Sequence, residues 1–202
     1  AIESIEADLA TERGRHDLFV LIGGRRVDAL LSNAGIGLGR AFLDQDFADV
    51  TQLLRTNIEG TLAVIHKIAH GMRARGEGRV PVTCSIAAYV AGPFQASYNG
   101  SKAFINPSAL ALRAELRSPG VSVTSLPPGI TESEFFRRGG QLDTRAARSR
   151  KDDPRMVARA GFDAMTRGDA FVISGWKNKI QIAIARCLPD SFLVRQHRRW
   201  SE

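Results

Sequence analysis

The stretch VDALLSNAG, residues 27–35, is a short apolar run that ends abruptly in small and polar residues. A second run, Val121 to Leu126, ends in a similar way at Pro127-Pro128-Gly129. Short runs bounded by turn residues are typical of strands that are buried on both faces of a parallel sheet. We therefore expect the chain to be built on such a sheet.

Helical patterns lie between and after these runs. Phe47 to Arg73 repeats apolar residues at helical spacing and is closed by glycines, and Tyr98 to Leu116 repeats them in the same way. Alternating strands and helices predict an α/β fold, a doubly wound Rossmann-like parallel sheet with helices on both faces. The remaining expected elements are strands at Ile2 to Ala7, Val80 to Cys84 and Ala170 to Ile173, and helices at Arg155 to Arg167 and Lys177 to Leu188.

Composition favours a single domain over residues 1–202, because 202 residues with 44% apolar content suffice for one core. Within it we expect a mobile substrate lid at 137–153, which is rich in Gly, Arg and Ser, and a C-terminal helical extension at 176–202. The sequence has no apolar run long enough for a membrane span and no signal pattern at its start, so we expect a soluble, cytoplasmic protein. Cys84 and Cys187 are expected to be reduced thiols, and no metal-ligand spacing is present.

The formal net charge is +7, and nearly all of the excess lies after residue 139. A basic tail can attract nucleic acid or anionic lipid. Because no aromatic residues are interleaved at stacking spacing, we favour a solvated basic face and expect no nucleic-acid partner.

The last predicted helix leaves two interpretations open. Its apolar residues and its basic residues could form an interfacial helix at a membrane surface, although core packing or a subunit contact explains such a pattern more often. The apolar set is Ile180, Ile182, Ile184, Ala185 and Leu188, and the basic set is Lys177, Lys179 and Arg186.

Polar and small residues follow four of the predicted strands. They are Asp8, Asn33-Ala34-Gly35, Ser85 and Pro128-Gly129. Ligands of doubly wound sheets bind outside the carboxyl ends of the strands. These residues therefore predict a ligand crevice.

The stretch SYNGSK, residues 97–102, places Tyr98 and Lys102 one helical turn apart, on the same face. A nearby cation favours the phenolate and brings a tyrosine into the range of acid–base chemistry. Ser85, at a strand end, could bind a carbonyl oxygen, and Asn57, inside the long helix, could hold a water beside the lysine. Each residue alone is more often structural, but their combination in this order favours catalysis.

With these residues together, the chain resembles a bacterial short-chain dehydrogenase/reductase over about residues 3–190. The resemblance rests on NAG at 33–35, the asparagine of LLRTNIEGT, the serine of CSIAAY, YNGSK at 98–102 and PPGITESEF at 127–135. It implies a catalytic tetrad of Asn57, Ser85, Tyr98 and Lys102. The implied reaction is reversible hydride transfer between a nicotinamide and a small-molecule carbonyl or alcohol.

The same resemblance implies NADP or NAD as the cofactor. Asp8 and Leu9 would contact the adenine side, Lys102 would hold the nicotinamide ribose with Tyr98 beside it, and a homodimer or homotetramer would form through residues 47–73 and 98–116. The other implied cofactor-binding residues are Asn33, Ala34, Gly35, Pro128, Gly129, Thr131 and Ser133.

The sequence departs from the family pattern at its start. No Gly-rich turn joins a first strand to a first helix, and the Gly35–Gly39 stretch follows the NAG strand instead, so we reject it as a phosphate cradle. The family's first strand, helix and second strand are missing, and Ile2 to Ala7 resembles its third strand. Either Ile2 to Ala7 pairs directly beside Val27 to Leu31, or the natural protein is longer, which a first residue of Ala favours.

Two prolines also conflict with the expected elements. Pro81 falls in a predicted central strand, and Pro107 falls inside the helix of Tyr98, where we expect a kink or a break. The alternative function is accordingly a non-catalytic remnant that acts as a binding or assembly protein.

Overall fold

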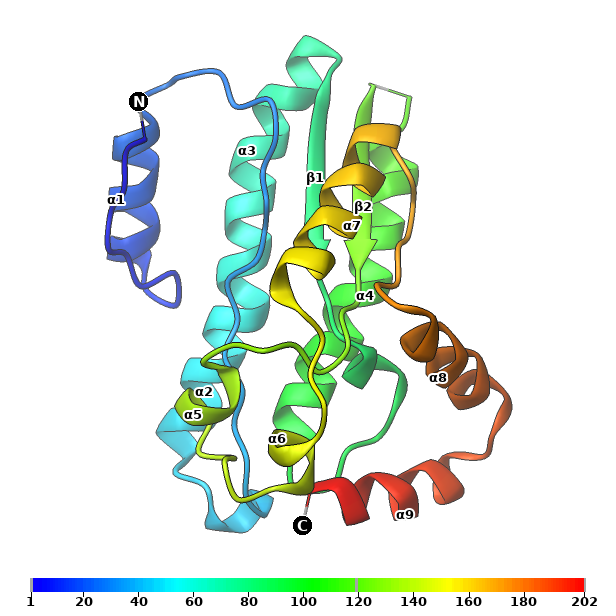
Figure 1. The fold of residues 1–202 in the computed structure, drawn as a ribbon. Helices are drawn as coiled ribbons and strands as arrows, with labels where there is room; N and C mark the ends of the chain where they lie inside the picture. Colours follow the sequence, from blue (N-terminus) through cyan, green and yellow to red (C-terminus); the bar gives the residue numbers. More distant parts are fainter. Residues whose placement is uncertain (1, 119, 202) are drawn as a thin grey trace.

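A computed structural model of the chain describes residues 2–118 and 120–201. Its centre is a parallel pair of strands, β1 (Gly78–Thr83) and β2 (Val121–Leu126), in register from Gly78 opposite Val121 to Thr83 opposite Leu126. Isolated parallel bridges extend the sheet on both sides, with residues 29–32 beside β1 and Phe171 beside Ser125 of β2. Figure 1 shows β1 and β2 side by side. The parallel sheet is therefore confirmed.

Pro81 explains why residues 29–32 pair with β1 only through isolated bridges. Leu30 donates its N–H to the Arg79 carbonyl, and Ser32 donates to the Pro81 carbonyl, each at 2.9 Å. In a parallel ladder the next hydrogen bond would run from the N–H of residue 81 to the Leu30 carbonyl, but proline has no N–H. The ladder is interrupted at that point.

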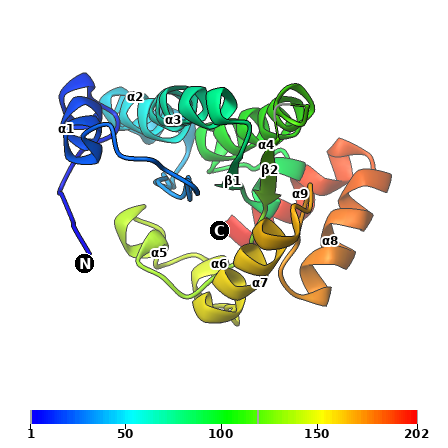
Figure 2. The same ribbon diagram turned by 90° about the horizontal axis from the view of Figure 1, so that it is seen from above.

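Helices cover both faces of the sheet, as predicted (Figure 2). On one face lie α3 (Thr61–Arg75) and α4 (Ala96–Leu116), and on the other lies α7 (Pro154–Arg167). The buried core between sheet and helices includes Ile65, Ala69, Met72, Val80, Val82, Ile105, Ala109, Val121 and Val123.

The long helix predicted at 47–73 is a continuous run of three pieces. It consists of α2 (Phe47–Leu54), a π-helical turn η2 (Arg55–Gly60) and α3. The later elements are a 3-10 turn η3 (Ile86–Tyr89), the short helices α5 (Phe135–Arg138) and α6 (Arg145–Arg148), and the C-terminal helices α8 (Trp176–Cys187) and α9 (Asp190–Ser201).

The N-terminal region differs from the prediction. Residues 2–7 form no strand, and Ile2 is 99% exposed, so the strand expected at Ile2 to Ala7 is wrong. Of the two alternatives for this segment, pairing directly beside Val27 to Leu31 does not occur. A helix that the sequence analysis did not anticipate follows, α1 (Glu12–Ile22), capped by the Thr11 hydroxyl and closed by Gly23 at φ 58°. Arg15 fixes it to η2 through an ion pair with Glu59 at 2.8 Å.

Pro107 does not break α4, which runs without interruption from Ala96 to Leu116. The expectation of a break is wrong because packing outweighs the lost backbone hydrogen bond. Ile105 and Ala109, on either side of the proline, are both buried against the sheet.

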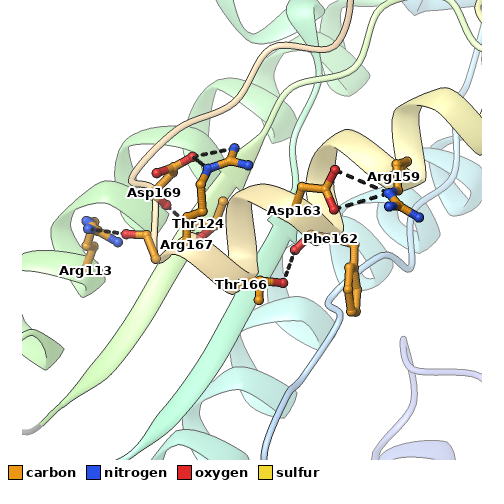
Figure 3. Close-up of polar contacts among 9 residues, drawn as sticks. Arg113, Thr124, Arg159, Phe162, Asp163, Thr166, Arg167 and Asp169 are labelled. Carbon is orange, nitrogen blue, oxygen red and sulfur yellow. Dashed lines mark hydrogen bonds and ion pairs between the residues drawn. The ribbon is translucent and has the colours of Figure 1, made fainter.

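Backbone carbonyls at the end of α7 bind polar side chains of the sheet and of α4 (Figure 3). Arg113 of α4 donates to the Val123 carbonyl at 2.9 Å and to the Gly168 carbonyl at 2.7 Å. Thr124 of β2 donates its hydroxyl to the Asp169 carbonyl at 2.7 Å. These bonds join α4, β2 and the C-terminal end of α7.

We expect Arg113→Met to lower the free energy of unfolding by about 2–4 kcal/mol, because two carbonyls lose a charged donor. Arg159→Met in α7 is the matched control. Arg159 makes only an exposed ion pair with Asp163, so its loss should cost less than about 0.5 kcal/mol. Urea unfolding of both variants measures the difference, and equal effects would contradict the role of Arg113.

Candidate active site

The four residues expected to form a catalytic tetrad are all buried and come from three neighbouring parts of the chain. Asn57 lies in η2, Ser85 lies two residues after β1 at the start of η3, and Tyr98 and Lys102 lie in the first turns of α4. Between 1% and 8% of each residue is exposed.

Asn57 binds the loop that follows the NAG motif. Its Oδ1 accepts from the Ile36 N–H at 2.8 Å, and its Nδ2 donates to the Ile36 carbonyl at 2.9 Å and to Ser101 Oγ at 3.0 Å. Both amide donors are therefore used within the protein. The π-helical turn that carries Asn57 is a feature often found at functional sites.

Lys102 lies beside Gly35, the last residue of the NAG motif. Its Nζ donates to the Thr83 carbonyl at 3.1 Å, and burial lowers its pKa from the usual value. A methyl group at position 35 would lie 3.2 Å from Nζ and 3.4 Å from Asn57 Oδ1. Glycine at this position therefore leaves room beside the buried ammonium group.

Tyr98 has a pKa of about 12 in this structure, because burial disfavours the phenolate. A hydrogen bond with Ser85 acts in the opposite direction and is the weaker effect. The Lys102 ammonium lies 6.0 Å from the centre of the Tyr98 ring. The expectation that Lys102 sets the pKa of Tyr98 is not met here, since burial outweighs it.

Phe135, which the sequence analysis did not single out, provides part of that burial. Its ring centre lies 5.0 Å from that of Tyr98, and it also contacts Phe136. A methyl group at Gly37 would come within 2.4 Å of the Phe135 ring, so the GIGLG loop accommodates this aromatic cover because it carries no side chain there. The two consecutive phenylalanines at 135–136 were the feature of the sequence that could have indicated an aromatic contact with the site.

Gln141 closes the same region and was also missed. It is 1% exposed, and its Oε1 accepts a hydrogen bond from Gln95, three residues before Tyr98. The Gly39 N–H donates to the Gly139 carbonyl at 3.1 Å. The segment 135–141 is therefore bonded to both the Gly35–Gly39 loop and the start of α4, and its expected mobility beyond 137 stays a prediction.

The predicted cofactor residues fall into two groups, one near the tetrad and one, Asp8 and Leu9, away from it. Asn33 lies near the tetrad with Ala34 and Gly35, and its Oδ1 accepts a hydrogen bond from Thr83 at 2.9 Å. Pro128 lies beside Ser85, because its carbonyl accepts a hydrogen bond from the N–H of Ile86 at 3.1 Å. Gly129, Thr131 and Ser133 follow Pro128 in the loop before α5, where Thr131 donates to the Gly129 carbonyl and Ser133 accepts from the N–H of Phe135.

Asp8 and Leu9 belong to a separate place on the surface of η2. The Asp8 carboxylate accepts from the Ala10 N–H at 3.0 Å and from Gln52, and the Leu9 carbonyl accepts from Arg15. Asp8 thus stabilises the turn before α1, and its contact with a cofactor stays a prediction.

The residues fit the nicotinamide end of a dinucleotide. The Lys102 ammonium beside Gly35 can donate to a ribose hydroxyl, and it has no acidic partner among the ion pairs of the described residues. The turn that would cradle the pyrophosphate does not occur in the sequence. The residues present therefore fit the nicotinamide half of the cofactor.

Residues 2–141 match the family model of the short chain dehydrogenases, which is more than half of the chain. The chain belongs to this family. Serine 3-dehydrogenase of Rhizobium radiobacter is 39% identical over 124 residues, which cover 60% of this chain and 49% of that protein. A probable NADP-dependent dehydrogenase of Haemophilus influenzae is 35% identical over 132 residues, 62% of this chain and 51% of that protein.

Solved structures place this short-chain dehydrogenase in the same fold. A short chain dehydrogenase/reductase family protein has a TM-score of 0.71 at 29% identity and covers 85% of this chain and 75% of its own. The chain spans about half the length of the curated relatives named above. In the part of the chain that the structure describes, no helix is long and apolar enough to cross a membrane.

We expect Lys102→Met to raise the free energy of unfolding by about 1 kcal/mol or more at neutral pH, since it removes a buried ammonium that has no carboxylate partner. The pKa of Lys102 is lowered by burial, so the cost of charging it is fully present below that pKa and is lost as the pH rises towards the usual lysine value. The gain should therefore shrink with rising pH. Urea unfolding at about pH 7 and about pH 10 tests this.

Lys67→Met, at an exposed position of α3, is the control for the loss of one positive charge. It should leave stability nearly unchanged at both pH values. A destabilised Lys102→Met variant would show that the bond to the Thr83 carbonyl outweighs the cost of burial.

Proposed function

We propose that this short-chain dehydrogenase transfers a hydride between a nicotinamide cofactor and a small carbonyl or alcohol substrate, with Asn57, Ser85, Tyr98 and Lys102 as its working residues. The observation that carries the proposal is that these four side chains are buried together, with Ser85 acting on the pKa of Tyr98 and with Gly35 beside the Lys102 ammonium. A phenol and a hydroxyl beside each other can bind one carbonyl oxygen together.

Each residue has a distinct task in this proposal. Tyr98 donates its phenolic proton to the substrate oxygen during reduction and accepts it during oxidation, while the Ser85 hydroxyl orients that oxygen. Lys102 binds a ribose hydroxyl. Asn57 fixes the Gly35–Gly39 loop through Ile36, and a water relay past Asn57 is part of the proposal. The bound cofactor supplies or accepts the hydride.

NADP or NAD is the proposed cofactor, with contacts from Asn33, Ala34, Gly35, Pro128, Gly129, Thr131 and Ser133 and, on the adenine side, from Asp8 and Leu9. The printed name of the Haemophilus influenzae relative, an NADP-dependent dehydrogenase, supports the NADP form. The names of similar proteins, serine 3-dehydrogenase and sulfoacetaldehyde reductase, favour a small polar substrate.

We also propose one catalytic domain over 1–202, with 137–153 as the substrate lid and 176–202 as a helical extension, that acts in the cytoplasm as a homodimer or homotetramer. Exposed apolar side chains on α2 and α4 support the oligomer. They are Phe47, Leu54, Phe104 and Leu110. Sedimentation equilibrium would measure the mass of the assembly.

Tyr98→Phe should lower kcat for carbonyl reduction at least about a hundredfold, because the proton donor is lost, and should leave nicotinamide binding intact. Tyr89→Phe is the control, since Tyr89 bonds Asn106 and is the other of the two tyrosines in the chain. Steady-state rates with NADPH and NADH, and fluorescence titration of each cofactor, give the two readouts. Retained turnover in Tyr98→Phe would contradict the assignment of Tyr98 as the proton donor.

Alcohol oxidation should become faster with rising pH up to at least about pH 10, because it needs the Tyr98 phenolate and the pKa of Tyr98 is about 12. Carbonyl reduction needs the phenol and should stay flat below that pH. Phe135→Ala removes cover from the ring, lowers the pKa of Tyr98 and should make the oxidation profile level off earlier. Profiles of kcat/KM against pH measure this. A plateau of the oxidation rate near neutral pH in the unmodified enzyme would contradict burial as the main influence on the pKa of Tyr98.

The alternative function, a non-catalytic binding or assembly protein, is favoured by one observation. Phe135 covers Tyr98 in the structure, where a substrate would have to lie. A folded chain that binds neither NADPH nor NADH would support this alternative and overturn the proposed hydride transfer.

A further inference from the structure

Helix α8 turns an apolar stripe towards solvent. Trp176, Ile180 and Ile184 follow one another at four-residue intervals, and they are 67%, 50% and 49% exposed. Residues at this spacing share one face of a helix. Core packing therefore holds for buried Ile182 but is wrong for Ile180 and Ile184, for which a subunit contact or a membrane surface stays open.

The opposite face of α8 is fixed to the protein. Asn178 donates to Asp152 and to the Ser174 carbonyl, each at 2.7 Å, and the Arg186 guanidinium lies 5.2 Å from the centre of the Tyr89 ring. A methyl group at Gly129 would come within 2.3 Å of Asn178. These contacts fix the rotation of the helix and leave the stripe exposed. Helix α8 lies at the edge of the molecule in both views (Figure 1, Figure 2).

Basic residues flank the stripe on both sides. At 100° per residue, Lys177 lies on one side of the line from Trp176 to Ile180, and Lys179 lies on the other. Both lysines are exposed, and the Lys177 ammonium is 5.8 Å from the centre of the Trp176 ring. The sequence has no acidic residue between Asp169 and Asp190.

This charge pattern distinguishes between two kinds of partner. A second copy on a two-fold axis would bring the same face against itself, because such an interface is self-complementary. Lys177 and Lys179 of each copy would then face a helix that has lysines but no acidic residue to pair with them, and like charges across an interface are costly. An anionic partner removes this repulsion.

We propose that α8 docks the protein reversibly onto an anionic lipid surface. Trp176, Ile180 and Ile184 lie at the level of the headgroups, where tryptophan is favoured and isoleucine buries apolar area. Lys177 and Lys179 bind the lipid phosphates and reach up along their aliphatic chains. The helix has 12 residues and lies in the plane of the surface. This surface contact is independent of the proposed hydride transfer.

Co-sedimentation with vesicles tests the proposal. The full chain is mixed with vesicles of phosphatidylcholine and phosphatidylglycerol, or of phosphatidylcholine alone, at low and high salt. We expect binding to the anionic vesicles only, and weaker binding as salt rises. Lys177→Gln and Lys179→Gln should each reduce the partition coefficient about fivefold.

Ile180→Glu, which places a charge in the middle of the stripe, should reduce the partition coefficient at least about tenfold. Leu43→Glu is the matched control, because Leu43 is an apolar residue with 92% exposure outside α8. It should bind vesicles within about twofold of the unmodified chain. Both positions are exposed, and circular dichroism verifies that each variant is folded.

Three outcomes would overturn the proposal. The first is equal binding to neutral and anionic vesicles, and the second is an Ile180→Glu variant that binds as the unmodified chain does. The third is a fall in the mass of the assembly at sedimentation equilibrium on Ile180→Glu, which would identify the stripe as a contact between two copies.

Discussion

The site depends on the side-chain amide of Asn57, which is bonded to two segments that are distant from it in sequence. It binds both backbone polar groups of Ile36 and the hydroxyl of Ser101, which in turn donates to the Tyr98 carbonyl at 2.7 Å. The glycine loop, the π-helical turn and the first turns of α4 are therefore held in one arrangement. Buried amide groups are almost always hydrogen-bonded, and the partners of Asn57 lie in the segments that carry Gly35 and Tyr98.

The positions of the four tetrad residues could be predicted from the sequence, because each one follows from a local pattern of helix or strand. Tyr98 and Lys102 are one helical turn apart, Ser85 ends a buried strand, and Asn57 interrupts a helical pattern. Each placement follows from local rules, and the rules agree with one another. The strands β1 and β2 could be predicted for the same reason, since their apolar runs can be buried only in a sheet covered on both faces.

Features that depend on a distant partner could not be predicted. Phe135 covers Tyr98 only because Gly37, almost a hundred residues earlier, leaves space for its ring. Residues 2–7 have the pattern of a strand, but a strand needs a neighbour to pair with, and none of the described segments supplies one. Pro107 violates helix propensity, and burial of the turns around it decides the outcome, a balance that the sequence does not display.

Pro81 has a consequence for the order in which parts of the fold open. The segment 29–32, which leads into the glycine loop, is bonded to β1 with one ladder bond missing, whereas β1 and β2 pair along their full length. Regions with fewer backbone bonds separate from the native structure at a lower free energy than the core does. We therefore expect the segment 29–32 to open at a lower free energy than the central strand pair, and to exchange its amide hydrogens with solvent while β1 and β2 stay paired.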